Sequence, residues 1–145
     1  MKTRRRARRV VLETLYEYDI VNHAPEEVLE RRIEENPMER AGLEFTTLLV
    51  KGVVEYQTHI DMLIARYAPE WPLDQMAVID RNILRIAIFE FLISEQTPVK
   101  VAINEAVELA KSYGSDSAPR FVNGVLGTLA DQLNDLKEEF LAVPT

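Results

Sequence analysis

The first nine residues of the chain concentrate side chains that bind phosphate. Six of the 17 Lys and Arg residues lie in this stretch, and no acidic residue occurs before Glu13. These six are Lys2, Arg4, Arg5, Arg6, Arg8 and Arg9. A guanidinium group pairs with phosphate through two hydrogen bonds, and its flat face stacks on a nucleic-acid base. The whole chain carries a formal net charge of -7, and a basic end on an acidic body indicates a polyanionic partner.

Folding alone gives no reason for this arginine cluster. Helical spacing predicts a first helix from about Arg4 to Ile20, with the arginines in its first turns. Cations at a helix N-terminus oppose the macrodipole, and each costs roughly a few tenths of a kcal/mol or more. An anionic partner explains the cluster better than the alternative, which is a solvated and frayed start to the chain.

The residues needed for catalysis or metal binding are missing or wrongly spaced. The chain has no cysteine, which excludes disulfides, thiolate chemistry and zinc-thiolate sites. Neither of its two histidines, His23 and His59, has a partner at a metal-ligand spacing, and no glycine-rich phosphate loop occurs. The acidic residues fall on the polar faces of expected helices, where paired acid–base catalysis has no support. We therefore expect neither an enzyme nor a metal or cofactor site.

Apolar residues recur at helical spacing throughout the chain, and no period-two alternation marks a strand. This pattern predicts an all-α fold with about six or seven helices. Prolines, glycines and polar turns place helices at about residues 4–20, 26–35, 39–67, 78–92, 98–114 and 120–140. We expect one domain over residues 1–145, in which residues 1–9 form a basic arm leading into the first helix. The sequence contains no long uncharged apolar stretch and no secretory signal, so we expect a cytoplasmic protein.

The stretch from Val78 to Leu92 is apolar on nearly all sides, which predicts a buried central helix. Its charged residues therefore need partners or access to water. We expect Arg85 to pair with a carboxylate on a neighbouring helix, such as Glu105 or Glu108.

Two turns are marked by their residue types. Trp71 lies between Pro69 and Pro72 in the segment that ends the third predicted helix, and we expect it to pack as a corner rather than to hold a ligand. Gly114 stands where a helix commonly ends with a left-handed residue.

Two segments closely resemble the NusB family of bacterial transcription antitermination factors. They are DRNILRIAIFEFL (residues 80–92) and PVKVAINEAVELAKSYGSDSAPRFVNGVLGTLA (residues 98–130), and the arginine-rich start followed by LYEYD also fits. The resemblance implies two small helical bundles packed together. It also implies a non-catalytic adaptor that binds the single-stranded boxA element of ribosomal RNA leaders together with NusE, a small-subunit ribosomal protein. The complex would then join the elongating RNA polymerase.

The resemblance also assigns site residues. The implied RNA-binding residues are Lys2, Arg4, Arg5, Arg6, Arg8, Arg9, Tyr16, Arg120 and Phe121. The residues implied to face NusE are Tyr16, Asp80 and Arg81. The chain departs from the family pattern at Ser117, where an acidic residue often occurs, and at the pair Pro119–Arg120. From the residues alone, Tyr16 and Phe121 could each stack on a base or pack in the core.

Two other interpretations of the chain stay open at this point. A helical interaction or dimerisation module would form a homodimer that hides the RNA surface. Some ribosomal RNA cytosine methyltransferases carry a NusB-like domain, but the 145 residues include no α/β cofactor-binding segment. The sequence leaves undetermined the oligomeric state and the preferred RNA sequence.

Overall fold

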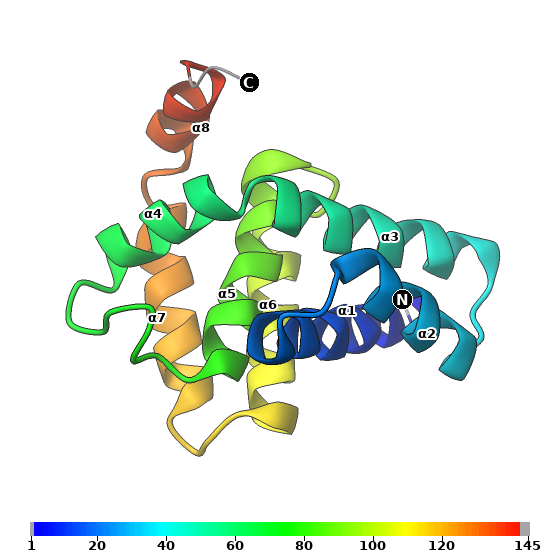
Figure 1. Cartoon of the computed structure of the whole chain (residues 1–145). Helices are drawn as coiled ribbons and strands as arrows, with labels where there is room; N and C mark the ends of the chain where they lie inside the picture. The colour runs from blue at the N-terminus through cyan, green and yellow to red at the C-terminus, as the bar shows by residue number, and fades with distance from the viewer. Residues whose placement is uncertain (1, 143–145) are drawn as a thin grey trace.

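The structure, a computed structural model, describes residues 2–142, with side chains for residues 3–142. All regular secondary structure in this part of the chain is helical, which confirms the predicted all-α class (Figure 1). It contains α1 (Lys2–Val21), α2 (Pro25–Glu35), α3 (Arg40–Glu55), α4 (Gln57–Tyr67), α5 (Val78–Ile88), the π-helix η1 (Phe89–Ile93), α6 (Val99–Tyr113), α7 (Ala118–Ala130) and α8 (Leu133–Ala142). None of these helices combines the length and the apolar character that crossing a membrane requires.

The prediction of six or seven helices was too low, because the described residues form eight α-helices. Two expected long helices are each divided. The helix expected over residues 39–67 bends at Tyr56, which has φ -101° and ψ 15°, and not at either of its glycines. The helix expected over residues 120–140 is interrupted between α7 and α8. Apolar spacing continues across both breaks, so periodicity alone does not reveal them.

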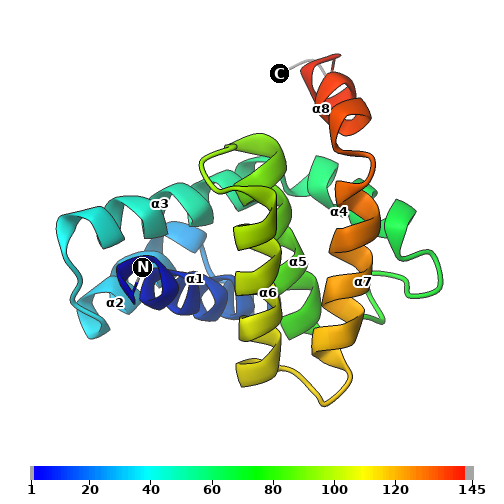
Figure 2. The same ribbon diagram turned by 180° about the vertical axis from the view of Figure 1, so that it is seen from behind.

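The central helix α5 continues into η1, and the other helices pack around this pair (Figures 1 and 2). α1, α2 and α3 form one group beside α5, whereas α4, α6 and α7 form a second group. α8 projects from the end of α7 and contacts η1. Ile83, Leu84, Ile86 and Ile88 of α5 are all fully buried. The buried central helix predicted from the sequence is thus confirmed, and it places both ends of α5 beside helices from distant parts of the chain.

Gly52 is required by the close approach of α3 to η1. A Cβ atom at this position would lie 2.0 Å from Cζ of Phe89. Phe89 is buried, and its ring packs 6.3 Å from the ring of Tyr56, centroid to centroid. The phenyl ring therefore occupies the space that any larger residue at position 52 would need.

We expect Gly52→Ala to lower the free energy of unfolding by about 2 kcal/mol, because overpacking a core costs roughly 1–3 kcal/mol and outweighs the gain in helix propensity. Urea unfolding measures the change. The control is Gly124→Ala in α7, where an added Cβ meets nothing within 4 Å. If Gly52→Ala lowered the free energy of unfolding no more than Gly124→Ala does, the steric conflict with Phe89 would be contradicted.

Gly114 ends α6, but the predicted left-handed conformation was wrong. The residue is extended, with φ -94° and ψ -179°. Glycine is needed there for space, since a Cβ atom would lie 2.5 Å from Cβ of Ala118. The absence of a side chain allows a tight connection between α6 and α7.

Candidate nucleic-acid interface

The arginines of α1 divide between the surface and the interior. Arg4, Arg5, Arg6 and Arg9 are exposed, whereas Arg8 is only 4% exposed. Helical spacing accounts for this division, because position 8 falls on the face that also carries the buried residues Ala7, Val11 and Leu12. The side chain of Lys2 lies outside those that the structure describes.

Arg8 forms a buried ion pair with Glu90 of η1. Its Nε and Nη2 atoms donate hydrogen bonds of 2.9 and 2.7 Å to the two carboxylate oxygens of Glu90. The hydroxyl of Thr97 donates a further bond of 2.7 Å to Oε1 of Glu90. This guanidinium is already paired and enclosed, so the structure gives Arg8 the role of fixing α1 against η1.

Arg4 and Arg5 are exposed but engaged with neighbouring helices. The Arg4 guanidinium lies 4.5 Å from the centroid of the Phe45 ring. Arg5 donates two hydrogen bonds of 3.1 and 2.7 Å to Glu105 of α6. The hydrogen bond and positive charge of Arg5 hold the pKa of Glu105 below its usual value. Both guanidinium groups are held in place while remaining accessible to an anion.

Arg6 and Arg9 have no carboxylate within 4.0 Å among the side chains that the structure describes. Together with Arg5 they line a surface hollow of about 520 Å³. We call this hollow the arginine hollow; its remaining lining residues are Val10, Glu13, Asn36 and Tyr113. Two guanidinium groups without an ion-pair partner in the described part of the chain have the chemistry to bind an anion at this hollow.

Tyr113 closes one side of the arginine hollow. Its hydroxyl donates a 2.9 Å hydrogen bond to Oε2 of Glu13. Burial, together with this bond to the carboxylate, raises the pKa of Tyr113 to about 12. The phenol therefore stays protonated at neutral pH and keeps Glu13 turned toward α6.

A second hollow, of about 400 Å³, lies where the connection between α4 and α5 meets the first turn of α7. We call it the tryptophan pocket; it is lined by Trp71, Gln75, Met76, Ala77, Asp80, Ser117, Arg120 and Phe121. The structure thus places Asp80, Arg120 and Phe121 around one pocket. The sequence analysis had assigned Asp80 to NusE and the other two residues to RNA. Phe121 is half-buried and packs against the core from one side. The alternative of packing in the core therefore holds in part, and the ring also lines the tryptophan pocket.

Trp71 does not pack as the corner that the sequence suggested. It is 54% exposed and faces the tryptophan pocket. The proline on either side gave a correct signal for a chain turn, but proline spacing does not tell which way the intervening side chain points. The buried residues of this connection are Ala68 and Met76.

The residues assigned to NusE differ in environment. Tyr16 is 39% exposed on α1. Arg81 donates hydrogen bonds of 2.8 and 2.9 Å to Asp19 and one of 2.8 Å to the Leu73 carbonyl oxygen. Oδ1 of Asp80 is buried and has no hydrogen-bond partner within the described part of the chain. Burial raises the pKa of this carboxyl group.

Arg85 pairs with carboxylates of other helices, as predicted, but the proposed partners were wrong. It donates two hydrogen bonds, of 2.8 and 2.9 Å, to Asp61 of α4 and one of 2.9 Å to Asp19 of α1. Glu105 binds Arg5 instead. Which helices surround α5 is decided by the tertiary packing, so the partner of a buried arginine cannot be chosen from spacing along the chain.

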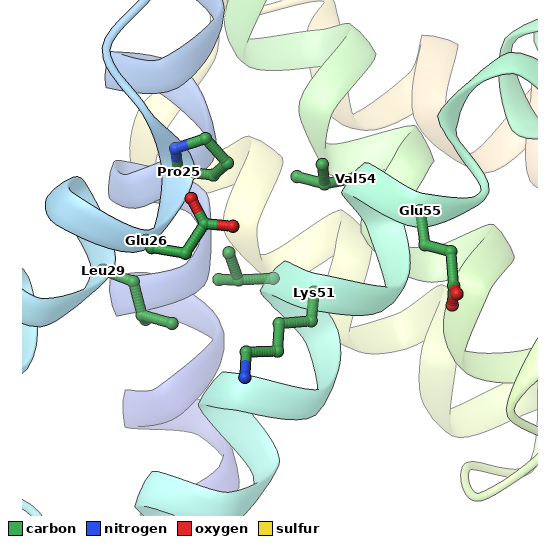
Figure 3. Close-up of a pocket in the computed structure, with 7 residues that line it drawn as sticks. Pro25, Glu26, Leu29, Lys51, Val54 and Glu55 are labelled. Carbon is green, nitrogen blue, oxygen red and sulfur yellow. The ribbon is translucent and has the colours of Figure 1, made fainter.

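An apolar groove of about 390 Å³ between α2 and α3 was not predicted (Figure 3). Pro25, Leu29, Val50 and Val54 supply its apolar lining, and Glu26, Lys51 and Glu55 are its charged residues. With two acidic groups and one basic group, this groove lacks the positive charge that a nucleic-acid surface needs. Within the described residues, no cluster of three or more metal-ligating side chains occurs.

Comparison with known proteins gives consistent matches. Residues 5–131 match the NusB family. The transcription antitermination protein NusB of Dehalococcoides mccartyi strain CBDB1 is 48% identical over 133 residues, which cover 92% of this chain and 93% of the relative. NusB of T. maritima superposes with a TM-score of 0.84 at 35% identity, covering 94% and 96% of the two chains. A chain from the crystal structure of antitermination factors NusB and NusE in complex with dsRNA has a TM-score of 0.83 at 27% identity, with coverage of 90% and 98%.

Proposed function

Because the chain belongs to the NusB family of antitermination factors, we propose that it binds the single-stranded boxA element of ribosomal RNA leaders together with NusE. The resulting complex then joins the elongating RNA polymerase in the cytoplasm. The protein is an adaptor and not an enzyme. We further propose that residues 1–145 act as one RNA-binding domain.

One observation carries the RNA-binding proposal: Arg6 and Arg9 are exposed beside one hollow, with no ion-pair partner among the described residues. Clustered guanidinium groups without carboxylates cost stability at a helix N-terminus unless an anion binds there. A single RNA strand supplies phosphates to pair with them and unstacked bases to lie on their planar faces. The exposure of Arg6 and Arg9 and their lack of ion-pair partners among the described residues both fit such a strand.

Within this proposal, the residues have different tasks. Arg4, Arg5, Arg6 and Arg9 contact phosphates, and Lys2 extends the same surface. Arg120 and Phe121 contact the RNA at the far side of the α6–α7 connection, and Tyr16 lies between RNA and NusE. Asp80 and Arg81 face NusE, with Arg81 also paired to Asp19. We leave Arg8 out of the contact surface, because its guanidinium is buried against Glu90.

Replacing both Arg6 and Arg9 with alanine should weaken binding to a boxA oligoribonucleotide and leave the melting temperature unchanged. Each phosphate that the variant no longer neutralises should reduce the slope of log K against log salt by roughly 0.7, the value expected for a single strand. Fluorescence anisotropy over a salt series, with RNA alone and with NusE present, measures both effects.

The control for this experiment is the double variant Lys51→Ala with Arg66→Ala, which removes the same charge from α3 and α4. It should bind RNA like the wild-type protein if contact at the arginine hollow matters. Equal losses from both double variants would mean that only net charge matters, and a wild-type protein that binds no boxA RNA would overturn the proposed function itself.

A further inference from the structure

We propose that Trp71 and Phe121 form the aromatic walls of a pocket that takes one unpaired base of the bound RNA. This inference rests on the proposed function and adds Trp71 to the residues that contact RNA. The pocket is the tryptophan pocket, which joins the α4–α5 connection to the first turns of α5 and α7. Its volume of about 400 Å³ leaves room for a nucleobase with part of its ribose.

Folding does not account for the exposure of Trp71. An indole with 54% of its surface in water leaves apolar area uncovered, whereas Met76 in the same connection is buried. The backbone around Trp71 is nevertheless well defined, because its N–H donates a 3.1 Å hydrogen bond to the Ala68 carbonyl oxygen and Pro72 follows directly. A large aromatic side chain held on a rigid turn and left exposed is suited to stacking, since little ordering is required when a base arrives.

The polar groups of the tryptophan pocket also suit a nucleotide. Arg120 is exposed and makes no ion pair with the described residues, so its guanidinium is available to the phosphate attached to the stacked base. Asp80 contributes a carboxyl group whose buried Oδ1 lacks a hydrogen-bond partner within the described part of the chain. Burial also raises the pKa of Asp80. Because Oδ1 of Asp80 is buried, an incoming base does not reach it, and Arg120 is the polar group that the pocket offers to a nucleotide.

The position of the pocket fits a strand that leaves the arginine hollow. Tyr113, the last residue of α6, lines the arginine hollow, and Ser117, just before α7, lines the tryptophan pocket. Figure 2 shows the short α6–α7 connection, and only a few residues of the chain separate Tyr113 of the arginine hollow from Ser117 of the tryptophan pocket. A single strand whose phosphates pair with Arg6 and Arg9 can pass this turn and place a base between Trp71 and Phe121.

Trp71 is the only tryptophan in the chain, so its fluorescence reports directly on the pocket. We expect a boxA oligoribonucleotide to quench this emission with the same affinity that anisotropy measures. Trp71→Ala should weaken RNA binding roughly fivefold or more, which is the lower end of what one base–aromatic stack contributes. Trp71→Phe keeps an aromatic face and should retain affinity within about twofold of the wild-type protein.

Met62→Ala is the matched control, because Met62 is an equally exposed apolar residue on α4 that does not line the pocket. It should leave RNA affinity unchanged, and thermal unfolding should show that all three variants are folded. RNA binding by the wild-type protein without quenching, or with equal affinity in Trp71→Ala, would overturn the base pocket while sparing the proposed function. A wild-type protein that fails to bind the RNA at any salt concentration would overturn both.

Discussion

Glu90→Ala is expected to lower the free energy of unfolding by about 3 kcal/mol, near the lower end of the cost of breaking a buried ion pair, because Arg8 keeps a longer contact of 3.6 Å with Glu105. The side chains of Arg8 and Glu90 are 5% and 2% exposed and share two hydrogen bonds. Removing the carboxylate leaves the buried guanidinium with only the longer contact of its Nη1 atom to Glu105, and the hydroxyl of Thr97 also loses its acceptor. Urea unfolding followed by circular dichroism measures the loss.

The control is Glu139→Ala, which breaks an ion pair on the surface that also has two hydrogen bonds. Glu139 accepts hydrogen bonds of 3.0 and 2.8 Å from Arg66, but both side chains are more than 40% exposed. Water takes the place of the carboxylate there, so this variant should unfold like the wild-type protein. If Glu90→Ala and Glu139→Ala lowered the free energy of unfolding equally, burial of the Arg8–Glu90 pair would not be the cause of the loss.

A second comparison separates the charge from the packing. Replacing the pair with apolar residues, as Arg8→Met with Glu90→Leu, should recover most of the stability lost in Glu90→Ala, because no unpaired charge remains. If the double variant were no more stable than the single one, the shape of the pair rather than its charge would hold α1 against η1.

The Arg8–Glu90 ion pair makes Arg8 a poor position at which to test RNA binding. Arg8→Ala removes an anchor of α1 as well as a positive charge, so a loss of RNA affinity in that variant would mix unfolding with weaker phosphate binding. Arg6 and Arg9 carry no such interior contact among the described residues, and they give the clearer test of phosphate binding.

Arg85→Ala is expected to lower the free energy of unfolding by about 3 kcal/mol, near the lower end for breaking a buried pair. Arg85 joins α5 to Asp61 of α4 and to Asp19 of α1. Its loss leaves Asp61 without this partner, whereas Asp19 keeps its hydrogen bonds from Arg81. Arg66→Ala on the surface is the matched control and should unfold like the wild-type protein. A loss no larger than that of Arg66→Ala would contradict a supporting role for this network.

The network also makes stability depend on pH in a defined direction. Burial works to raise the pKa of Asp19, but hydrogen bonds from Arg81 and Asn82 and the charge of Arg85 outweigh it, and the pKa is lowered. The stability from Asp19 is therefore fully present above about pH 4, near its unfolded pKa, and is lost as the pH falls through the folded pKa. Asp19→Asn should consequently lose less stability than the wild-type protein when the pH falls from about 5 to about 2. An unchanged acid dependence would contradict the lowered pKa.

The helical class, the central helix and the basic start of the chain were all evident in the sequence, because each follows from the type and spacing of neighbouring residues. Apolar residues at helical intervals predict helices, and the run of arginines remains visible whatever the fold. The matched segments at residues 80–92 and 98–130 likewise predicted the family, which the relatives confirm.

Only the tertiary structure decided which residues of those patterns meet. Arg8 and Glu90 lie 82 positions apart, and no spacing rule pairs them, yet their ion pair removes one arginine from the surface. The same is true of the bond between Arg85 and Asp19, and of Trp71 and Phe121, which line one pocket only because the helices pack around α5. The sequence by itself determined that positive charge is concentrated at the start of the chain. The packing of α1 against η1 and α6 determined which guanidinium groups remain in water, because burial depends on contacts between helices that local periodicity does not record.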